Sequence, residues 1–148
     1  MAAPAITAVA DAIVTVLTSN GFTEAERRWL PYVKLTYLAD RKTVVIPKLE
    51  TLTEDGARSG QDREYTLGVV IQKHVPADLE AAVATLVANV ETLIAACDVE
   101  GFLRDATPAD ATFLDGPEFP RGVLYDPEKL LDPRIFFSAL TLRYEYLE

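Results

Sequence analysis

An apolar stripe at helical spacing near the middle of the chain constrains the fold more than any other feature. Its members recur at intervals of three and four residues: Leu79, Ala82, Val83, Leu86, Val90, Leu93, Ile94 and Cys97. Glu80 and Glu91 fall outside the stripe, so the pattern predicts one amphipathic helix that begins near Pro76 and Asp78. Because such a helix needs another element to cover its apolar face, the chain must supply a second layer.

A shorter stripe near the N-terminus predicts a second helix of the same kind. Pro4 stands at its start, where a missing backbone N–H costs nothing, and Gly21 suits a left-handed cap at its end. The apolar positions are Ile6, Val9, Ala10, Ile13, Val16 and Leu17. Two helices with one apolar face each therefore flank the intervening part of the chain.

Alternating apolar residues predict the strands that these helices cover. Residues Tyr65 to Lys73 place Tyr65, Leu67, Val69 and Ile71 on one face. The closing segment, Ile135 to Leu147, does the same with Phe136, Leu140, Leu142, Tyr144 and Tyr146. On its other face lie Thr141, Arg143 and Glu145, which we expect to meet solvent or a partner.

Two further apolar runs predict a β-hairpin. Tyr32 to Leu38 and Val44 to Ile46 flank the polar turn Asp40 to Lys42, and Pro47 indicates an edge position or a strand end. The segment Thr53 to Arg63 is polar with two glycines, so we expect a mobile loop.

The stretch 98–132 carries nine acids, three basic residues and four prolines. We expect a partly ordered connection with one short strand near Ala111 to Leu114. Together the elements predict a single domain over residues 1–148. The fold class is α+β: a two-layer sandwich of a mostly antiparallel or mixed sheet, with two amphipathic helices on one face.

The net charge of the chain argues against binding to nucleic acid. The chain has 23 acidic and 14 basic residues, a formal charge of −9, so it should repel a phosphate backbone. The apolar N-terminus lacks a basic region and contains Asp11, which argues against a signal peptide. Because 18 uncharged apolar residues never run together, we expect no transmembrane helix and a cytoplasmic protein.

No residue set predicts catalysis, a cofactor or a metal site, and we expect no enzyme. His74 and Cys97 are the single histidine and cysteine, too few for a zinc site, and no motif places a nucleophile beside the histidine. Gly56 and Gly60 lack the lysine of a phosphate loop. The loop acids fit no calcium spacing and are read as solvated charges: Asp105, Asp110, Asp115 and Asp126.

Protein contacts are the remaining role, and several residues are candidates for them. Phe119, Tyr125, Leu130 and Leu131 stand among prolines and acids, where a small monomer has little core left to receive them. The open alternative is that they fold back as a lid over the sheet. Three arginines complete the set. Arg58 and Arg63 could pair with the acidic surface of a neighbouring subunit, and Arg143 lies on the solvent- or partner-facing side of the last strand.

The order of elements resembles that of the tail terminator (tail completion) proteins of tailed bacteriophages. The likeness rests on the leading amphipathic helix, the hairpin, the polar loop, the "YTLGVVIQK" strand and the second helix. The ending "GVLYDPEKLLDPRIFFSALTLRYEYLE" adds to it, with a Tyr-Asp turn before one long strand.

The resemblance implies a homo-oligomeric ring, typically of six subunits, that caps the tail tube protein and presents a surface to the head–tail connector (neck) protein. DNA would pass through it without specific binding, and carboxylates lining the lumen would repel phosphate. The protein would lie in the host cytoplasm during assembly and then in the neck of the virion.

Two alternatives stay open. One is another small neck or adaptor protein, or an unrelated oligomeric scaffold. The other is a carboxylate-dependent enzyme acting on a small ligand. Solution mass separates the oligomers from a monomeric enzyme, whereas a deep pocket lined by converging acids would favour the enzyme.

Overall fold

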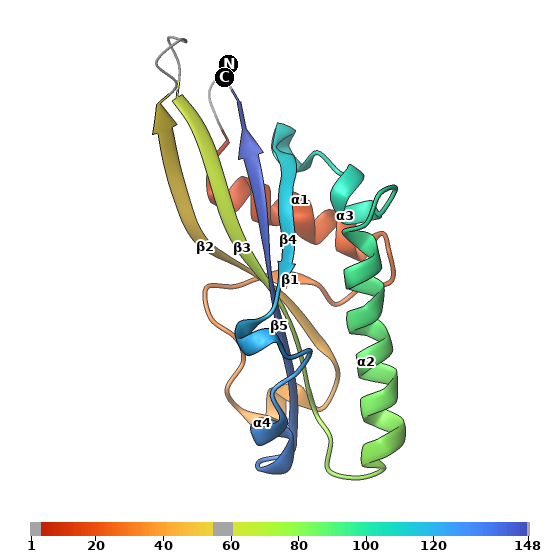
Figure 1. The fold of residues 1–148 in the computed structure, drawn as a ribbon. Coiled ribbons are helices and arrows are strands. Elements are labelled where there is room, and N and C mark those ends of the chain that lie inside the picture. Colours follow the sequence, from red (N-terminus) through yellow and green to blue (C-terminus); the bar gives the residue numbers. More distant parts are fainter. Residues whose placement is uncertain (1–3, 55–60, 148) are drawn as a thin grey trace.

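The computed structural model describes residues 4–54 and 61–147 as helices packed on a five-stranded mixed sheet. The sheet order is β1-β2-β3-β5-β4, with β1 and β2 parallel and every other pair antiparallel (Figure 1). In chain order the elements are α1 (Ile6–Thr18), β1 (Glu26–Arg27), the 3-10 turn η1 (Leu35–Leu38), β2 (Lys42–Glu54), β3 (Gln61–His74), α2 (Leu79–Ala96), α3 (Phe102–Asp105), η2 (Pro108–Asp110), β4 (Thr112–Glu118), η3 (Pro120–Gly122), α4 (Pro127–Leu131) and β5 (Ile135–Tyr146).

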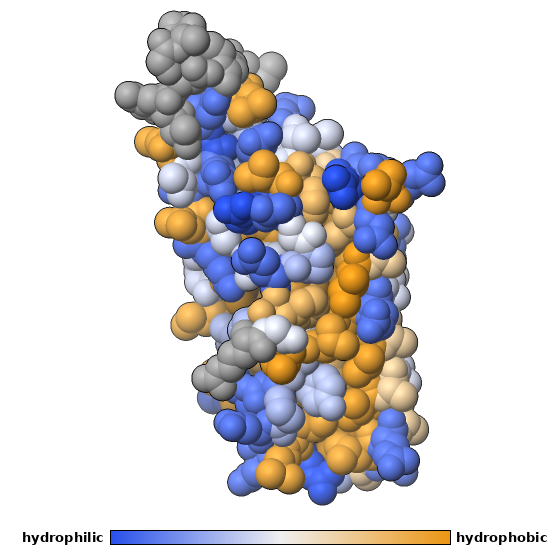
Figure 2. Space-filling view, viewed as in Figure 1, coloured by the Kyte–Doolittle hydropathy of each residue, from blue (hydrophilic) through white to orange (hydrophobic). Residues whose placement is uncertain are grey.

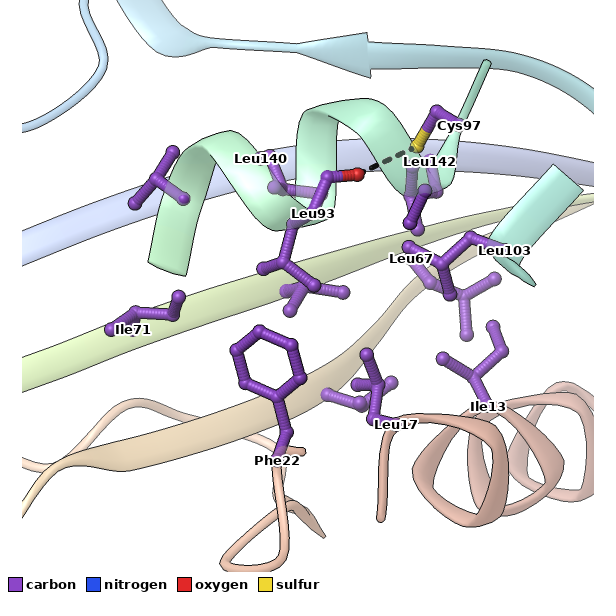
Figure 3. Packing of buried hydrophobic residues seen from close by; sticks show 14 of the residues in the cluster. Ile13, Leu17, Phe22, Leu67, Ile71, Leu93, Cys97, Leu103, Leu140 and Leu142 are labelled. Carbon is purple, nitrogen blue, oxygen red and sulfur yellow. Dashed lines mark hydrogen bonds between the residues drawn. The ribbon is translucent and has the colours of Figure 1, made fainter. Parts of the chain in front are cut away.

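The main core lies between one face of the sheet and the two long helices, which confirms the predicted fold class. The alternating apolar residues of β3 and β5 meet the predicted stripes of α1 and α2 there. Figure 3 shows side chains from both layers converging: Ile13, Leu17, Phe22, Leu93, Cys97 and Leu103 against Leu67, Ile71, Leu140 and Leu142. The predicted strands Tyr65 to Lys73 and Ile135 to Leu147 are confirmed as β3 and β5, although β3 begins four residues earlier than predicted. The predicted mobile loop Thr53 to Arg63 is therefore too long, because its two ends belong to β2 and β3, and residues 55–60 lie outside the described residues.

The predicted strand Tyr32 to Leu38 is wrong. This stretch crosses the opposite face of the sheet, where Tyr32 packs on a smaller cluster of Val44, Ile46 and Val70. Its end turns through η1, and that turn buries Leu38 completely. The segment therefore covers a face of the sheet and does not extend its edge.

The predicted hairpin is also wrong. The strand that pairs with β2 over its whole length is β3, which follows it in the chain. Pro47 lies inside β2, where the register shifts before Leu49. The prediction of an edge position is confirmed, since β1 pairs only with Val44 and Val45 and nothing described pairs with the outer side of β2 at Pro47. A residue without an N–H is tolerated there because that side makes no ladder bond.

The acidic connection 98–132 contains the predicted strand, which is β4 and runs on to Glu118. Beyond β4, the chain runs beside the first residues of β5. The backbone N–H of Asp126 donates to the Phe137 carbonyl at 2.9 Å, and the Ser138 hydroxyl donates to the Leu124 carbonyl. Asp126 also caps α4, its carboxylate accepting from the backbone N–H groups of Glu128 and Lys129.

Candidate protein-interaction surface

The predicted apolar interface residues lie in contrasting settings. Phe119 and Tyr125 pack partly on the main core, and the Tyr125 ring lies 5.3 Å from that of Phe136. Leu130 is buried in the same core, whereas Leu131 is 79% exposed. The segment therefore folds over its own sheet to a large extent, and Leu131 is the member of the set that it presents outward.

The predicted arginines, where the structure describes them, pair with acids of their own chain. Arg143 donates to Asp115 on β4 and to Glu64 on β3, which ties three strands together on the exposed face of the sheet. The Arg143 hydrogen bond lowers the pKa of the Asp115 carboxyl. Arg63 donates to Glu50 at 2.9 Å across β2 and β3. Arg58 lies outside the described residues.

An exposed apolar segment that the sequence patterns did not single out lies between β1 and β2. We call residues 28–38 the aromatic segment. Five of its large apolar side chains are 39–85% exposed: Trp29, Leu30, Val33, Leu35 and Tyr37. Such a concentration is unusual on a monomer surface and is typical of protein–protein contacts. The prediction of a strand from Tyr32 to Leu38 concealed part of this signal, because one face of a strand would have been buried.

The backbone of the aromatic segment is anchored to the sheet at Tyr32, although five of the segment's apolar side chains are exposed. The backbone N–H of Tyr32 donates to the side-chain oxygen of Gln72 at 3.0 Å, and the Gln72 amide donates back to the Tyr32 carbonyl at 2.8 Å. The Tyr32 hydroxyl donates to Glu26, which raises the pKa of Tyr32, and the Arg28 guanidinium lies 3.9 Å from the ring centre. A binding surface fixed in this way loses little conformational entropy when a partner docks.

Positive charge surrounds the aromatic segment in an otherwise acidic chain. Residues 27–42 contain five bases and one acid, a net of +4, so the remainder of the chain carries −13 against the total of −9. Arg27 is paired with Asp11 at 2.7 Å, and Arg41 is paired with Glu24. Lys34 lies over the Tyr37 ring at 6.0 Å, near enough for a cation–π contact. Trp, Tyr and Arg side chains gathered in this way are typical of interaction hot spots.

A pocket of about 230 Å³ opens beside β5. Phe137 and Ala139 of β5 line it, and they pack against the same small cluster as Tyr32. The other lining residues come from the acidic connection: Pro120, Val123, Tyr125, Asp126, Pro127 and Glu128. The pocket is smaller than the roughly 300–1,000 Å³ of small-molecule sites, and it is comparable to one large side chain.

The pocket does not meet the expectation for a carboxylate-dependent enzyme. Of its two acids, Asp126 is engaged in capping α4 and Glu128 is exposed. Within residues 4–54 and 61–147, no group of three or more His, Cys, Asp or Glu side chains is placed to hold a metal ion.

The single cysteine belongs to the core. The Cys97 thiol donates to the Leu93 carbonyl at 3.4 Å (Figure 3), and burial raises its pKa to about 11. A thiol with so little thiolate near neutral pH is a poor nucleophile. His74 is the last residue of β3 and is half-buried.

Helix α2 leaves much of its surface uncovered. With 18 residues and a mean hydropathy of 1.5, it is long and apolar enough to cross a membrane, by length and composition alone. It nevertheless contains Glu80 and Glu91, and its buried stripe faces the sheet. Figure 2 shows apolar residues gathered along α2 and beside it, and hydrophilic residues over much of the upper part of the sheet.

Comparison with known proteins gave no relative: no protein-family model matches the chain, and no curated protein matches it.

Proposed function

We propose that this chain is a structural assembly protein that associates with further copies of itself, and that it acts as a tail terminator. In this role a homo-oligomeric ring, typically of six subunits, caps the tail tube protein of a bacteriophage and joins it to the connector protein on the head side. The protein would assemble in the host cytoplasm and remain in the neck of the virion. The observation that carries the association is the aromatic segment.

The physical argument begins with exposed apolar area. Leaving a large aliphatic or aromatic side chain in water forfeits roughly 1.5–3 kcal/mol relative to burying it. The aromatic segment keeps Trp29, Leu30 and Val33 more than half exposed although its backbone is anchored to the sheet. Docking against another chain recovers that free energy, and the anchored backbone limits the entropy that docking costs.

The specific role is supported by the part of the resemblance that does not depend on the predicted hairpin, namely the leading helix, the "YTLGVVIQK" strand, the second helix and the long last strand. The charge of one face of the sheet also supports it. Four acids surround Arg143 on the face of the sheet that points away from the two long helices: Glu64, Asp115, Glu118 and Glu145. Facing the lumen of a ring, these acids would repel phosphate and let DNA pass without binding. A net charge of −9 agrees with this use.

The test is the mass of the purified protein, measured by light scattering over a wide concentration range, alone and with isolated tail tubes. We expect a mass several times 16.3 kDa and sedimentation with the tubes. The double variant Leu30→Asp and Val33→Asp should remain folded and lose association. The matched control Val99→Asp, which changes a 77% exposed residue just after α2, should keep it. A monomer at every concentration that ignores the tubes would contradict the proposal.

A second candidate uses the same surface. As another neck adaptor or an oligomeric scaffold, the protein would associate through the aromatic segment without binding a tail tube. An oligomer of defined mass that fails to sediment with tubes would favour this role over the terminator.

A further inference from the structure

We infer that Trp29 of one copy enters the pocket beside β5 of a second copy. This inference rests on the proposed function, because it names the contact by which copies associate. A protein side chain would fill the pocket, and the partner of the aromatic segment would be a second copy of the same chain.

The donor side of the contact is a large side chain in a basic setting. Trp29 is 62% exposed, and the Arg27 guanidinium lies 5.7 Å from the centre of its ring. Arg28 precedes it in the chain. The indole offers a broad apolar surface and a single N–H donor, a combination that makes tryptophan a frequent anchor in protein interfaces.

The acceptor side has the matching chemistry. Phe137, Ala139 and Val123 give the pocket apolar walls, and Asp126 and Glu128 bring carboxylates into its lining. An indole in this space would bury its apolar body and leave its N–H near an acceptor. Lys129 lies over the Phe137 ring at 3.8 Å and so occupies one aromatic face that a ligand would otherwise use.

Charge complementarity indicates that the partner is a second copy. The segment 27–42 has a formal net charge of +4, and the connection 98–132, which supplies most of the pocket, has a formal net charge of −6. Arg27, Arg28 and Arg41 pair with acids of their own chain, so the positive charge available to a partner is smaller than this sum but keeps its sign. These segments attract each other when they belong to different copies, and like segments repel, so the charges fix which surfaces meet. Since every copy carries both anchor and pocket, the contact can be repeated from subunit to subunit.

The first arm of the test removes the anchor. Sedimentation equilibrium of Trp29→Ala should give a dissociation constant for self-association at least about tenfold above that of the parent. The control Val99→Ala, which truncates a side chain that is even more exposed, should leave the constant unchanged. Melting temperatures close to the parent would show that both variants are folded.

The second arm exchanges charges across the contact. Arg28→Glu and Glu128→Arg should each weaken self-association, because each places like charges together across the contact. Arg28→Glu also places a carboxylate beside Glu26 of its own chain, so recovery in the mixture is the result that supports the contact. In an equimolar mixture the glutamate introduced in one variant meets the arginine introduced in the other, so association should recover. The mixture measures an intermolecular pair, which a folding defect in either variant would not restore.

The outcomes are distinguishable. A parent protein that associates while Trp29→Ala associates equally well would overturn this contact and leave the proposed function intact. Weakening by Trp29→Ala without weakening by Glu128→Arg, or without recovery in the mixture, would place Trp29 against another surface and overturn the pocket assignment. A parent that is monomeric at every concentration would refute the proposed function, and the contact with it.

Discussion

Gln72 and Tyr32, forty residues apart in the chain, are joined by two hydrogen bonds between one side-chain amide and both backbone groups of one residue. The amide of Gln72 supplies the two hydrogen bonds that the backbone of Tyr32 would otherwise make with a neighbouring strand. It satisfies an N–H and a carbonyl that would otherwise be left without partners at the surface of the sheet. This pairing explains why the chain can cross the face of the sheet at Tyr32 without forming a strand.

Replacing Gln72 by leucine should therefore loosen the aromatic segment. The side chain is 2% exposed, and the change leaves the N–H and carbonyl of Tyr32 without their partners, at a cost of about 1–3 kcal/mol in the free energy of unfolding. Urea unfolding measures the loss, and trypsin cleavage after Lys34 should become faster. Lys73→Leu, at the neighbouring half-exposed position, is the control and should change stability by less than about 0.5 kcal/mol. Equal stability of Gln72→Leu and the parent would refute the role given to these bonds.

The bond between Arg143 and Asp115 should make stability depend on pH in a defined direction. The pKa of Asp115 is lowered from its ordinary value of 3.8, so its charged form stabilises the folded state above that value. This contribution is lost as the pH falls through the folded-state pKa. Asp115→Asn should accordingly be less stable than the parent at about pH 7, and the difference should become smaller at about pH 2.

Urea unfolding of both proteins at the two pH values checks this expectation. Glu91→Gln, an exposed change on α2, controls for the loss of one negative charge. A deficit for Asp115→Asn that is the same at both pH values would mean that the carboxylate charge does not act through Arg143.

Cys97 should resist thiol reagents in the folded protein. Burial excludes the reagent, and a pKa raised to about 11 leaves little thiolate near neutral pH. Labelling of Cys97 with a chromogenic disulfide reagent should be slow in buffer and rapid in denaturant. A cysteine introduced by Val99→Cys, at an exposed position two residues away, should react at once in the native state. Fast labelling of the parent would show that the end of α2 opens readily.

Two adjacent leucines on α4 should differ greatly in how much the same substitution costs. Leu130 is 9% exposed and belongs to the core, so Leu130→Ala should lower the free energy of unfolding by about 2–5 kcal/mol. Leu131→Ala, at 79% exposure, should change it by less than about 0.5 kcal/mol. Thermal melts compare the two directly. If Leu131→Ala proved as costly as Leu130→Ala, α4 would have to pack with its other leucine toward the core.

A substitution at Tyr125 cannot separate an effect on association from an effect on folding. Because its ring packs on Phe136, a charge at position 125 should destabilise the fold as well as any contact between copies. Leu131→Asp is the cleaner probe of this region, since its exposed side chain can meet a partner without repacking the core.

Periodicity in the sequence determined the elements that carry the main core. The stripes of α1 and α2 and the alternation of β3 and β5 are local patterns. An apolar face with one of these two repeats can be buried in essentially one way, so the two-layer α+β arrangement followed from the residues alone. The short strand β4 was also predictable, although its end at Glu118 was not.

Tertiary structure decided where each segment without a clear repeat would go. Tyr32 to Leu38 has the composition of a strand, but Gln72 on β3 satisfies the Tyr32 backbone and the cluster at Val70 receives its ring. Likewise, burial of Leu130 and exposure of Leu131 follow from how α4 lies against β5, which no pattern in a run of prolines and acids specifies. Local sequence fixes which face of an element is apolar. Only the folded chain determines which of those faces find a partner within it, and the aromatic segment is among the parts that stay exposed.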